Sequence, residues 1–415
     1  MLKGFRFQLQ LTKEQESLCS QYAGCCRFVW NRSLALKKDL WEKEKKDLKR
    51  FSLDALLVGW KQEFPWLAEA PAQALQQVNK DLDRAFQNFF RRCKTGETPG
   101  YPRFKKKGVH DAFRFPQGIH LRADINARWG LARLPKLGEV KFRKTMDIQG
   151  EIQNATLSKC SGKWFLSFCC KDVPVAAVAS GNGAVGIDRG VAVFAALSDG
   201  TMLLGPEPGR RHAKRLAKVQ RGLSRKKKFS RNWRKQKNKL QRLHAHVANI
   251  RRDFLQKAST TIVKNHAVVV LESLRTKNMT RGAAGTVQEP GTNVRAKSGL
   301  NRAILDQGWH AFENMLAYKL AWRAGALVKV KAHYTSQTCS SCGYCARENR
   351  LTQEKFQCQG CGHEANADLN AAQNILAAGH VAKACGGDSS GDPVKQEAQI
   401  AKAAHMLHKL GILAV

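Results

Sequence analysis

The segment AVGIDRGVAVFAALSDGTMLL (184–204) contains three short apolar runs, and the first run ends at an acidic residue, Asp188. The turn-forming residues Ser198-Asp199-Gly200 separate the second run from the third. Short apolar runs bounded by turn residues are typical of β-strands. The segment therefore predicts a three-strand meander whose first strand carries a carboxylate at its end.

Helices and strands alternate after this meander. A long basic helical section leads to the apolar strand AVVVLE (267–272), and a helix over Gln307–Arg323 leads to a second strand, ALVKVKA (326–332). An amphipathic helix over Asp368–Leu376 follows the last strand. The resulting order, β-β-β-α-β-α-β-α, is that of an RNase H-like α/β domain.

Three acidic residues stand at the ends of these elements: Asp188 and Glu272 close strands, and Asp368 opens the last helix. Singly, Asp188 could be a turn residue, Glu272 a surface acid and Asp368 a helix N-cap, for which Asp is favoured. Together they match the acidic constellation of RNase H-like nucleases, where carboxylates from different elements hold two metal ions about 4 Å apart. We therefore expect all three to be catalytic and to bind Mg²⁺ or Mn²⁺, which prefer oxygen ligands.

Four cysteines have the spacing of a structural zinc site. Cys339-x-x-Cys342 and Cys358-x-x-Cys361 are separated by 15 residues, and a glycine follows each pair. Four thiolates complete a tetrahedron around Zn²⁺ and leave no open position, so we expect this zinc to fold an insert and to do no chemistry. A redox pair is the alternative. Two nearby residues, Cys345 and His363, are weaker ligand candidates because their spacing breaks the paired pattern.

The balance of charge indicates a polyanionic partner. The 415 residues include 71 Lys or Arg against 33 Asp or Glu, a formal net charge of +38, which favours nucleic acid. No run of 18 apolar residues and no apolar signal region occur, which disfavours a membrane. The odd count of 13 cysteines favours a reducing compartment. We expect a cytoplasmic, nucleoid-associated protein of a bacterium or archaeon.

Basic residues concentrate in one acid-free stretch. Between Glu207 and Asp253 the chain has 18 Lys or Arg residues and no acid. Apolar residues recur at helical spacing from Leu240 to Phe254, so these helices keep a buried seam beneath the charge. The absence of interleaved acids favours contacts to phosphates. Residues expected to bind nucleic acid here and in a second basic segment are Arg103, Lys105, Lys106, Lys107, Arg221, Arg225, Lys226, Lys227, Arg231, Arg234 and Lys235.

The N-terminal half has a different pattern. Residues 1–10 alternate apolar and polar side chains, as in a strand, and a helical pattern runs over 11–94. The Pro- and Gly-punctuated stretch 95–108 ends the helical block, and residues 109–178 return to short alternating segments. This order predicts a small β-barrel with helices inserted after its first strand. The Ala- and Gly-rich stretch 175–183 reads as the linker to the second half.

The order and spacing of ten short segments resemble the TnpB (OrfB) family of transposon-encoded nucleases, which is related to type V CRISPR effectors. The resemblance covers nearly the whole chain. These segments are CCRFVWN (25–31), GYPRFKKKG (100–108), GIDRG (186–190), RGLSRKKKFSRNWRKQKNKL (221–240), RRDFLQKAS (251–259), LESL (271–274), KSGLNRAILDQGW (297–309), TSQTCSSCG (335–343), CQGCG (358–362) and NADLNAAQNI (366–375). One departure is Ala367, where many members of the family carry Arg.

The resemblance implies a multidomain α+β architecture. Its parts are a wedge β-barrel (1–10 and 95–178), an inserted helical recognition lobe (11–94), a RuvC/RNase H-like nuclease domain (181–338 and 365–380), a zinc-ribbon insert (339–364) and a C-terminal tail (381–415). Matched to the family's motifs, Asp188, Glu272 and Asp368 fall on the catalytic acids, and the four paired cysteines fall on the zinc ligands.

The resemblance also implies an RNA-guided DNA endonuclease encoded by an insertion sequence. A guide RNA transcribed from the transposon end would pair with double-stranded target DNA beside a short motif that the protein reads. A single RuvC site would then hydrolyse both strands in turn, and we expect a monomeric protein. Two alternatives are a nuclease-inactive RNA-guided regulator, which would need an acid to be lost, and an unguided structure-selective RuvC-type nuclease. A strand-transferring transposase is a further alternative, for which no other machinery is visible.

Overall fold

The computed structural model describes residues 1–109, 111–122, 125–174, 183–331 and 334–384. The chain divides into two compact units, Met1–Pro174 and Val175–Val415, and each has its own hydrophobic core. The expected linker lies at this boundary. Its residues 175–182 fall outside the described ranges, as does the expected tail beyond residue 384.

The first unit contains one antiparallel sheet of seven strands in the order β2-β6-β7-β1-β5-β4-β3. Its strands are β1 (Lys3–Gln10), β2 (Ala112–Phe115), β3 (His120–Leu121), β4 (Trp129–Leu134), β5 (Gly138–Arg143), β6 (Glu151–Cys160) and β7 (Lys163–Lys171). Apolar and polar side chains alternate along β1, and its apolar residues Phe5, Phe7 and Leu9 all point into the core. This pattern suits a strand in the centre of the sheet.

The sheet curls without closing, so the closed barrel expected from the sequence is not seen. Strand β1 pairs with β7 through Lys3–Gln8 and then changes partner to β5 at Leu9 and Gln10. The edge strands are β2 and β3, and no pairing joins them in the described part of the chain. These edges are short, at four and two residues, and offer few backbone groups for closure.

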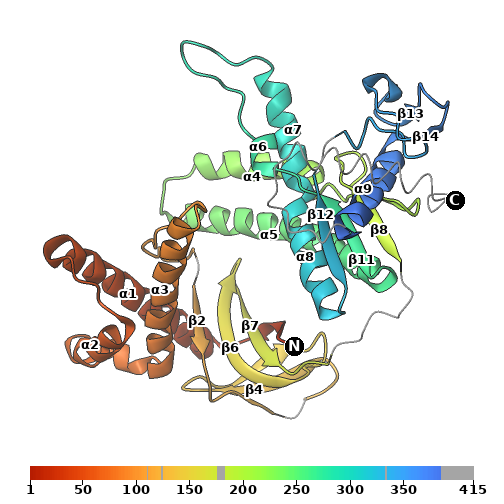
Figure 1. Ribbon diagram of the computed structural model, residues 1–415. Coiled ribbons are helices and arrows are strands. Elements are labelled where there is room, and N and C mark those ends of the chain that lie inside the picture. The colour runs from red at the N-terminus through yellow and green to blue at the C-terminus, as the bar shows by residue number, and fades with distance from the viewer. Residues whose placement is uncertain (110, 123–124, 175–182, 332–333, 385–415) are drawn as a thin grey trace. The chain divides into compact units, whose positions relative to one another are not determined.

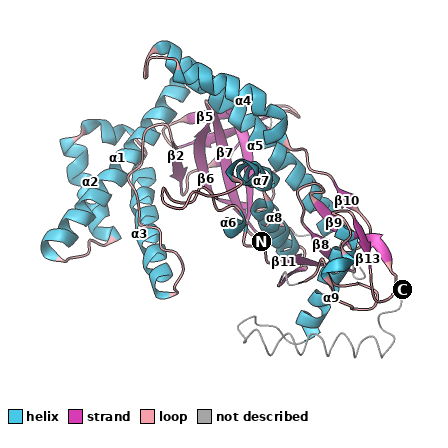
Figure 2. Ribbon diagram, turned by 90° about the horizontal axis from the view of Figure 1, so that it is seen from above, coloured by secondary structure: helices cyan, strands magenta, loops and turns pink. Residues whose placement is uncertain are grey.

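Three helices and a short 3₁₀ turn are inserted between β1 and β2, as the sequence predicts. They are α1 (Lys13–Glu44), α2 (Arg50–Glu63), η1 (Pro65–Glu69) and α3 (Ala72–Lys94). A capping box of Thr12 and Gln15 starts α1. Helices α1 and α3 pack together and against β2, so the helices and the sheet share one hydrophobic core (Figure 2).

The second unit contains a mixed, RuvC-like sheet in the order β10-β9-β8-β11-β12. Its strands are β8 (Ala184–Asp188), β9 (Ala195–Leu197), β10 (Met202–Leu203), β11 (Val268–Glu272) and β12 (Ala326–Val330). Strands β8 to β10 form the predicted antiparallel meander, and β8, β11 and β12 run parallel. Because β8 and β11 are parallel, both strands end at the same edge of the sheet, and the acids that close them lie together at that edge.

Six helices of the described chain connect and cover this sheet. They are α4 (Pro208–Ser224), α5 (Arg231–Asn265), α6 (Thr276–Met279), α7 (Val294–Gln307), α8 (Trp309–Trp322) and α9 (Ala367–Ala384). The apolar seam of α5 turns inward at Leu243 and Val247, as predicted. Helix α9 runs to Ala384, beyond the predicted end at Leu376, because its small residues continue to pack on the sheet.

The cysteine segment forms a small insert between β12 and α9. It holds a 3₁₀ turn, η2 (Arg347–Asn349), and the two-stranded sheet of β13 (Lys355–Gln357) and β14 (Glu364–Asn366). No helix in the described chain has both the length and the apolar character that crossing a membrane requires.

Helix α9 lies directly on β8 because Gly186 has no side chain (Figure 1). A Cβ at Gly186 would collide with the carbonyl oxygen of Ala372 and would lie 2.6 Å from the backbone nitrogen of Leu376. Ala371 and Ala372 are themselves small and buried. The strand and the helix that carry two of the candidate acids are therefore held at backbone contact.

We predict that Gly186→Ala destabilises the second unit by about 1–3 kcal/mol, because the added methyl group must push α9 away from the sheet. Urea unfolding monitored by circular dichroism measures the loss. Gly183→Ala is the matched control, since a Cβ there meets nothing within 4 Å. Equal stability of the two variants would contradict the close packing of α9 on β8.

Candidate functional site

Asp188, Glu272 and Asp368 line one pocket of about 290 Å³ in the second unit. Asp188 ends β8, Glu272 ends β11, and Asp368 lies in the first turn of α9. Residues separated by more than 80 positions therefore meet because two parallel strands end beside the start of a helix. The structure brings together all three acids that the sequence singled out.

The electrostatics of the pocket are those of crowded like charges. Burial, and then the charges of Glu272 and Asp368, raise the pKa of Asp188 to about 7. Burial also raises the pKa of Asp368, although the nearby Arg350 opposes this. Two acids with raised pKa values in one pocket indicate a site that requires positive charge to be fully ionised.

The local surroundings exclude the simpler roles of Glu272 and Asp368. Glu272 is only 8% exposed, and its carboxylate accepts a hydrogen bond from the Thr335 hydroxyl, so it is not a surface acid. Helix α9 is capped by the side chain of Asn366, which accepts from the backbone N–H groups of Asp368 and Leu369. The Asp368 carboxylate is therefore not used as the N-cap and faces the pocket.

Arg350 is a pocket residue that the sequence did not single out. It belongs to the cysteine insert, and its Nη2 lies 3.6 Å from Oδ1 of Asp368. Its backbone forms a bridge with Phe356, which fixes it within the insert. No periodic or spacing signal marks this arginine, because the contact joins two separately folded segments.

Two asparagines on α9 tie the start of the insert to the helix. The Nδ2 of Asn370 donates to the carbonyl oxygen of Thr338, and that of Asn374 donates to those of Thr335 and Thr338. The Oδ1 of Asn370 accepts from the N–H of Ser340. In the sequence, the only mark of this role is that the two asparagines stand four residues apart on an otherwise apolar helix face.

The acidic pocket fits divalent metal ions by the chemistry of its donors. It presents three carboxylates, the ligand type that hard ions such as Mg²⁺ and Mn²⁺ prefer. Burial, and then the charges of Glu272 and Asp368, raise the pKa of Asp188, so a nearby cation would favour its ionised form. Among the described residues, the four cysteines below are grouped more tightly than these three acids.

The four paired cysteines form a compact cluster. The sulfur atoms of Cys339, Cys342, Cys358 and Cys361 all lie within 4.8 Å of one another. Two of the sulfur pairs are separated by 3.8 and 3.6 Å. A tetrahedral zinc with bonds of about 2.3 Å requires sulfur atoms about 3.8 Å apart, so the cluster fits Zn²⁺. The nearby Cys345 is not part of it.

The two cysteine pairs are built alike. In each, the glycine after the second cysteine donates its N–H to the carbonyl oxygen of the first and adopts a positive φ, at Gly343 and Gly362. The buried Asn349 joins the two halves by donating to the carbonyl oxygens of Gln337 and Tyr344 and accepting from the N–H of Gln359. Arg350 follows Asn349 directly, so the fold of the insert sets the place of this arginine.

The predicted nucleic-acid residues of the second unit lie on α4, α5 and the loop between them. All seven, from Arg221 to Lys235, are exposed, and none forms an ion pair in the described part of the chain. Helices α4 and α5 lie side by side (Figure 2) and enclose a groove of about 720 Å³. Four cations and no acid line it: Arg215, Lys235, Lys239 and Arg242.

The predicted basic segment of the first unit is fastened to α1. The indole N–H of Trp30 donates to the carbonyl oxygen of Arg103, and Asn31 exchanges two hydrogen bonds with the backbone of Lys105. The Lys105 ammonium lies 3.8 Å from the centre of the Trp30 ring, and burial lowers its pKa. Lys105 nevertheless remains exposed to solvent over part of its surface, as do Arg103, Lys106 and Lys107.

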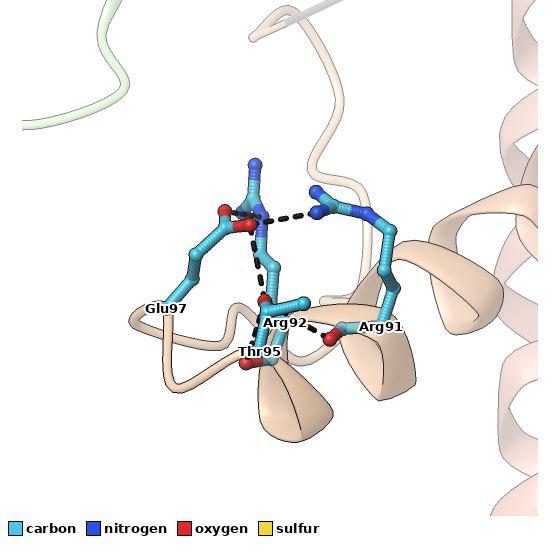
Figure 3. Close-up of polar contacts among 4 residues, drawn as sticks. All are labelled: Arg91, Arg92, Thr95 and Glu97. Carbon is cyan, nitrogen blue, oxygen red and sulfur yellow. Dashed lines mark hydrogen bonds and ion pairs between the residues drawn. The ribbon is translucent and has the colours of Figure 1, made fainter. Parts of the chain in front are cut away.

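Two further arginines of the first unit, Arg91 and Arg92, already pair with an acid. At the end of α3, Glu97 pairs with Arg91 at 2.6 Å and with Arg92 at 3.7 Å, and Thr95 donates to the same carboxylate (Figure 3). The hydrogen bond from Arg91 contributes most to lowering the pKa of Glu97. The helix end is therefore less positive than its sequence suggests.

We predict that Asp188→Asn stabilises the protein at pH 8 by about 2 kcal/mol more than at pH 5, when Mg²⁺ and Mn²⁺ are absent. The folded protein holds the Asp188 proton up to about pH 7, whereas the unfolded chain releases it near pH 4, so ionisation of the carboxyl weakens the fold as pH rises. Thermal unfolding at the two pH values measures this. An effect that is independent of pH would contradict the crowded acidic pocket.

We predict that the purified protein contains about one zinc ion per chain and that Cys342→Ser removes it, since three thiolates bind zinc far more weakly than four. Elemental analysis by mass spectrometry measures the zinc. Cys345→Ser is the matched control, because this exposed cysteine lies nearby but outside the cluster. Equal zinc loss in both variants would show that the ligand set differs from the four cysteines.

Three family models match the chain. Residues 167–283 match OrfB_IS605, described as "Probable transposase", and residues 309–375 match the TNB domain described as Cas12f1-like. Residues 1–46 match a helix-turn-helix domain. In that region the structure has the strand β1 and the single long helix α1, not two helices joined by a turn.

Relatives of known name and similar folds agree with these matches. A chain from Streptomyces pristinaespiralis named "Putative RNA-guided DNA endonuclease" is 33% identical, over 92% of this chain and 91% of its own length. A Cas12f1 chain solved with single-guide RNA and target DNA shares the fold, with a TM-score of 0.56 and 13% identity over 91% of this chain and 98% of that one.

A relative from Escherichia coli strain K12, named "Putative RNA-guided DNA endonuclease InsQ", is 49% identical. The alignment covers 95% of this chain and 97% of that protein. Identity at this level over nearly the full length, with the two domain matches in the second unit, establishes the relationship. The chain belongs to the TnpB (OrfB) family of IS605-type insertion sequences, which is related to Cas12f.

Proposed function

We propose that this protein is an RNA-guided DNA endonuclease that cuts target DNA beside a short adjacent motif by two-metal hydrolysis at a single site. The observation that carries the proposal is the convergence of Asp188, Glu272 and Asp368 in one pocket. The names of its relatives in Escherichia coli and Streptomyces pristinaespiralis support the guided mode of action.

The domain assignment follows from the same proposal. The seven-stranded sheet of the first unit corresponds to the wedge, and α1 to α3 correspond to the recognition lobe. The five-stranded sheet with α4 to α9 corresponds to the RuvC nuclease domain, and the four-cysteine insert is its zinc ribbon. Zinc binding would hold the insert folded, and with it the position of Arg350 beside Asp368.

The chemistry assigned to the pocket is phosphodiester hydrolysis. Asp188, Glu272 and Asp368 would hold Mg²⁺ or Mn²⁺, which when bound supply charge to activate water and stabilise the leaving oxygen. Thr335 orients the carboxylate of Glu272 by donating its hydroxyl proton to it. Arg350 supplies a cation in the lining of the pocket, close to Asp368, and would attract the phosphate of a DNA strand.

The basic surfaces would hold nucleic acid by its backbone. In guided effectors, base pairing reads the sequence and the protein grips the duplex by charge and shape. The groove between α4 and α5 offers four cations that pair with no carboxylate of the described residues, and the segment at Arg103 to Lys107 offers a second cationic surface. Each phosphate contact of this kind weakens as salt rises.

We predict that a discrete, structured RNA with a variable 3′ end co-purifies with the protein when the gene is expressed with its native downstream flank. Sequencing of the bound RNA measures this. The complex is expected to cut matched double-stranded DNA, and Asp188→Ala is expected to lower the cutting rate by at least about 10³-fold while the RNA stays bound.

Other results would favour the alternatives. Heterogeneous RNA that washes off in salt would indicate an unguided RuvC-type nuclease with a general polyanion grip. A discrete RNA with binding but no cutting of matched DNA would indicate a guided regulator without nuclease activity. The presence of all three acids in one pocket counts against the regulator.

A further inference from the structure

Arg189 follows Asp188 directly and lies almost entirely inside the second unit. Its side chain is 1% exposed, although it carries a permanent charge, and it lines the acidic pocket. An arginine in such a place loses its hydration, and an apolar residue of similar size would often be as stable there. The buried charge therefore indicates a purpose other than stability.

The partners of Arg189 come from two other elements, β11 and α8. Its Nη2 donates to the backbone carbonyl oxygen of Glu272, at the end of β11. Its Nη1 lies 3.3 Å from Oε2 of Glu313 on α8. The other carboxylate oxygen of Glu313, Oε1, pairs with the ammonium of Lys329 on β12. A row of alternating charges, Arg189, Glu313 and Lys329, thus starts at the pocket lining and continues through residues that do not line it.

Arg189 joins the ends of β8 and β11 at the point where their backbone pairing has stopped. The parallel pairing of β8 with β11 is last seen at Ile187 opposite Leu271. Asp188 pairs with Ala196 on β9, and Glu272 pairs with Val330 on β12. The two acids do not pair with each other. The guanidinium of Arg189 is attached by the chain to one acid and by a hydrogen bond to the backbone of the other.

We infer that Arg189 is a positioning residue, held by Glu313 and Lys329, that sets the separation of Asp188 and Glu272 required for metal binding. The planar guanidinium bonds two partners in fixed directions, which a lysine ammonium does not. Residues behind metal ligands typically change metal affinity 10- to 100-fold when altered. The inference rests on the proposed metal-dependent function.

The test is a titration of the full chain, bound to its guide RNA and retaining zinc, with Mn²⁺ as the probe. Electron paramagnetic resonance of free Mn²⁺ gives the binding curve, and guided DNA cutting gives the half-saturating Mn²⁺ concentration and the maximal rate. The variants are Arg189→Lys, which keeps the charge, and Asp188→Ala, which identifies the binding that belongs to the pocket.

Arg251→Lys is the matched control. Arg251 also bonds one carbonyl oxygen and one carboxylate, both of Asp306, but it lies outside the pocket. We expect Arg189→Lys to raise both the Mn²⁺ dissociation constant and the half-saturating Mn²⁺ concentration about ten-fold, with the maximal rate nearly restored at high Mn²⁺. Arg251→Lys is expected to leave both values unchanged.

The outcomes separate the two claims. Unchanged Mn²⁺ binding in Arg189→Lys, or an equal shift in Arg251→Lys, overturns the positioning role while the metal site stands. Parental Mn²⁺ binding in Asp188→Ala overturns the metal site, and the positioning role with it. If Arg189→Lys does not fold, Lys329→Met at the exposed end of the row is tested in its place. A two- to three-fold weaker affinity for Mn²⁺ supports the inference, and an unchanged affinity overturns it.

Discussion

The backbone contact between β8 and α9 is the constraint on which the candidate site depends. It exists because Gly186 has no side chain and because Ala371 and Ala372 are small. Asp188 lies two residues beyond Gly186, and Asp368 lies one turn before Ala372, so the depth of this packing sets the distance between two carboxylates. Burial of Asp188, and then the charges of Glu272 and Asp368 close to it, raise its pKa. The fold therefore holds the acids together against their own charge.

The zinc insert is joined to the acidic pocket through the same helix. Asn370 and Asn374 bind the start of the insert to α9, and Thr335 reaches from that segment to Glu272. Arg350, at the far side of the insert, lies beside Asp368. The segment from Thr335 through the four-cysteine insert thus places a hydroxyl and a guanidinium at the acidic pocket. The four-cysteine cluster and the candidate catalytic pocket share one set of contacts, although their residues are different.

Local patterns were sufficient for part of this arrangement. Apolar runs ending in acid predicted the ends of β8 and β11, and paired cysteines at fixed spacing predicted the cluster, because both signals lie within a few residues. Closure of the predicted barrel is not seen in the described residues, because alternation along a strand does not determine which strands become the edges of a sheet. Arg189 and Arg350 could not be predicted as pocket residues. Their partners lie on other elements, and no spacing along the chain records such a contact.

The central claim is that the three carboxylates form one site for divalent metal. Crystals of the protein soaked in Mn²⁺ and measured at the manganese and zinc absorption edges test it most directly, because anomalous peaks locate and identify the ions whether or not the protein is active. We expect two Mn²⁺ peaks within bonding distance of Asp188, Glu272 and Asp368, and a separate zinc peak at the four cysteines. A pocket without a manganese peak, while the zinc peak is present, would contradict it.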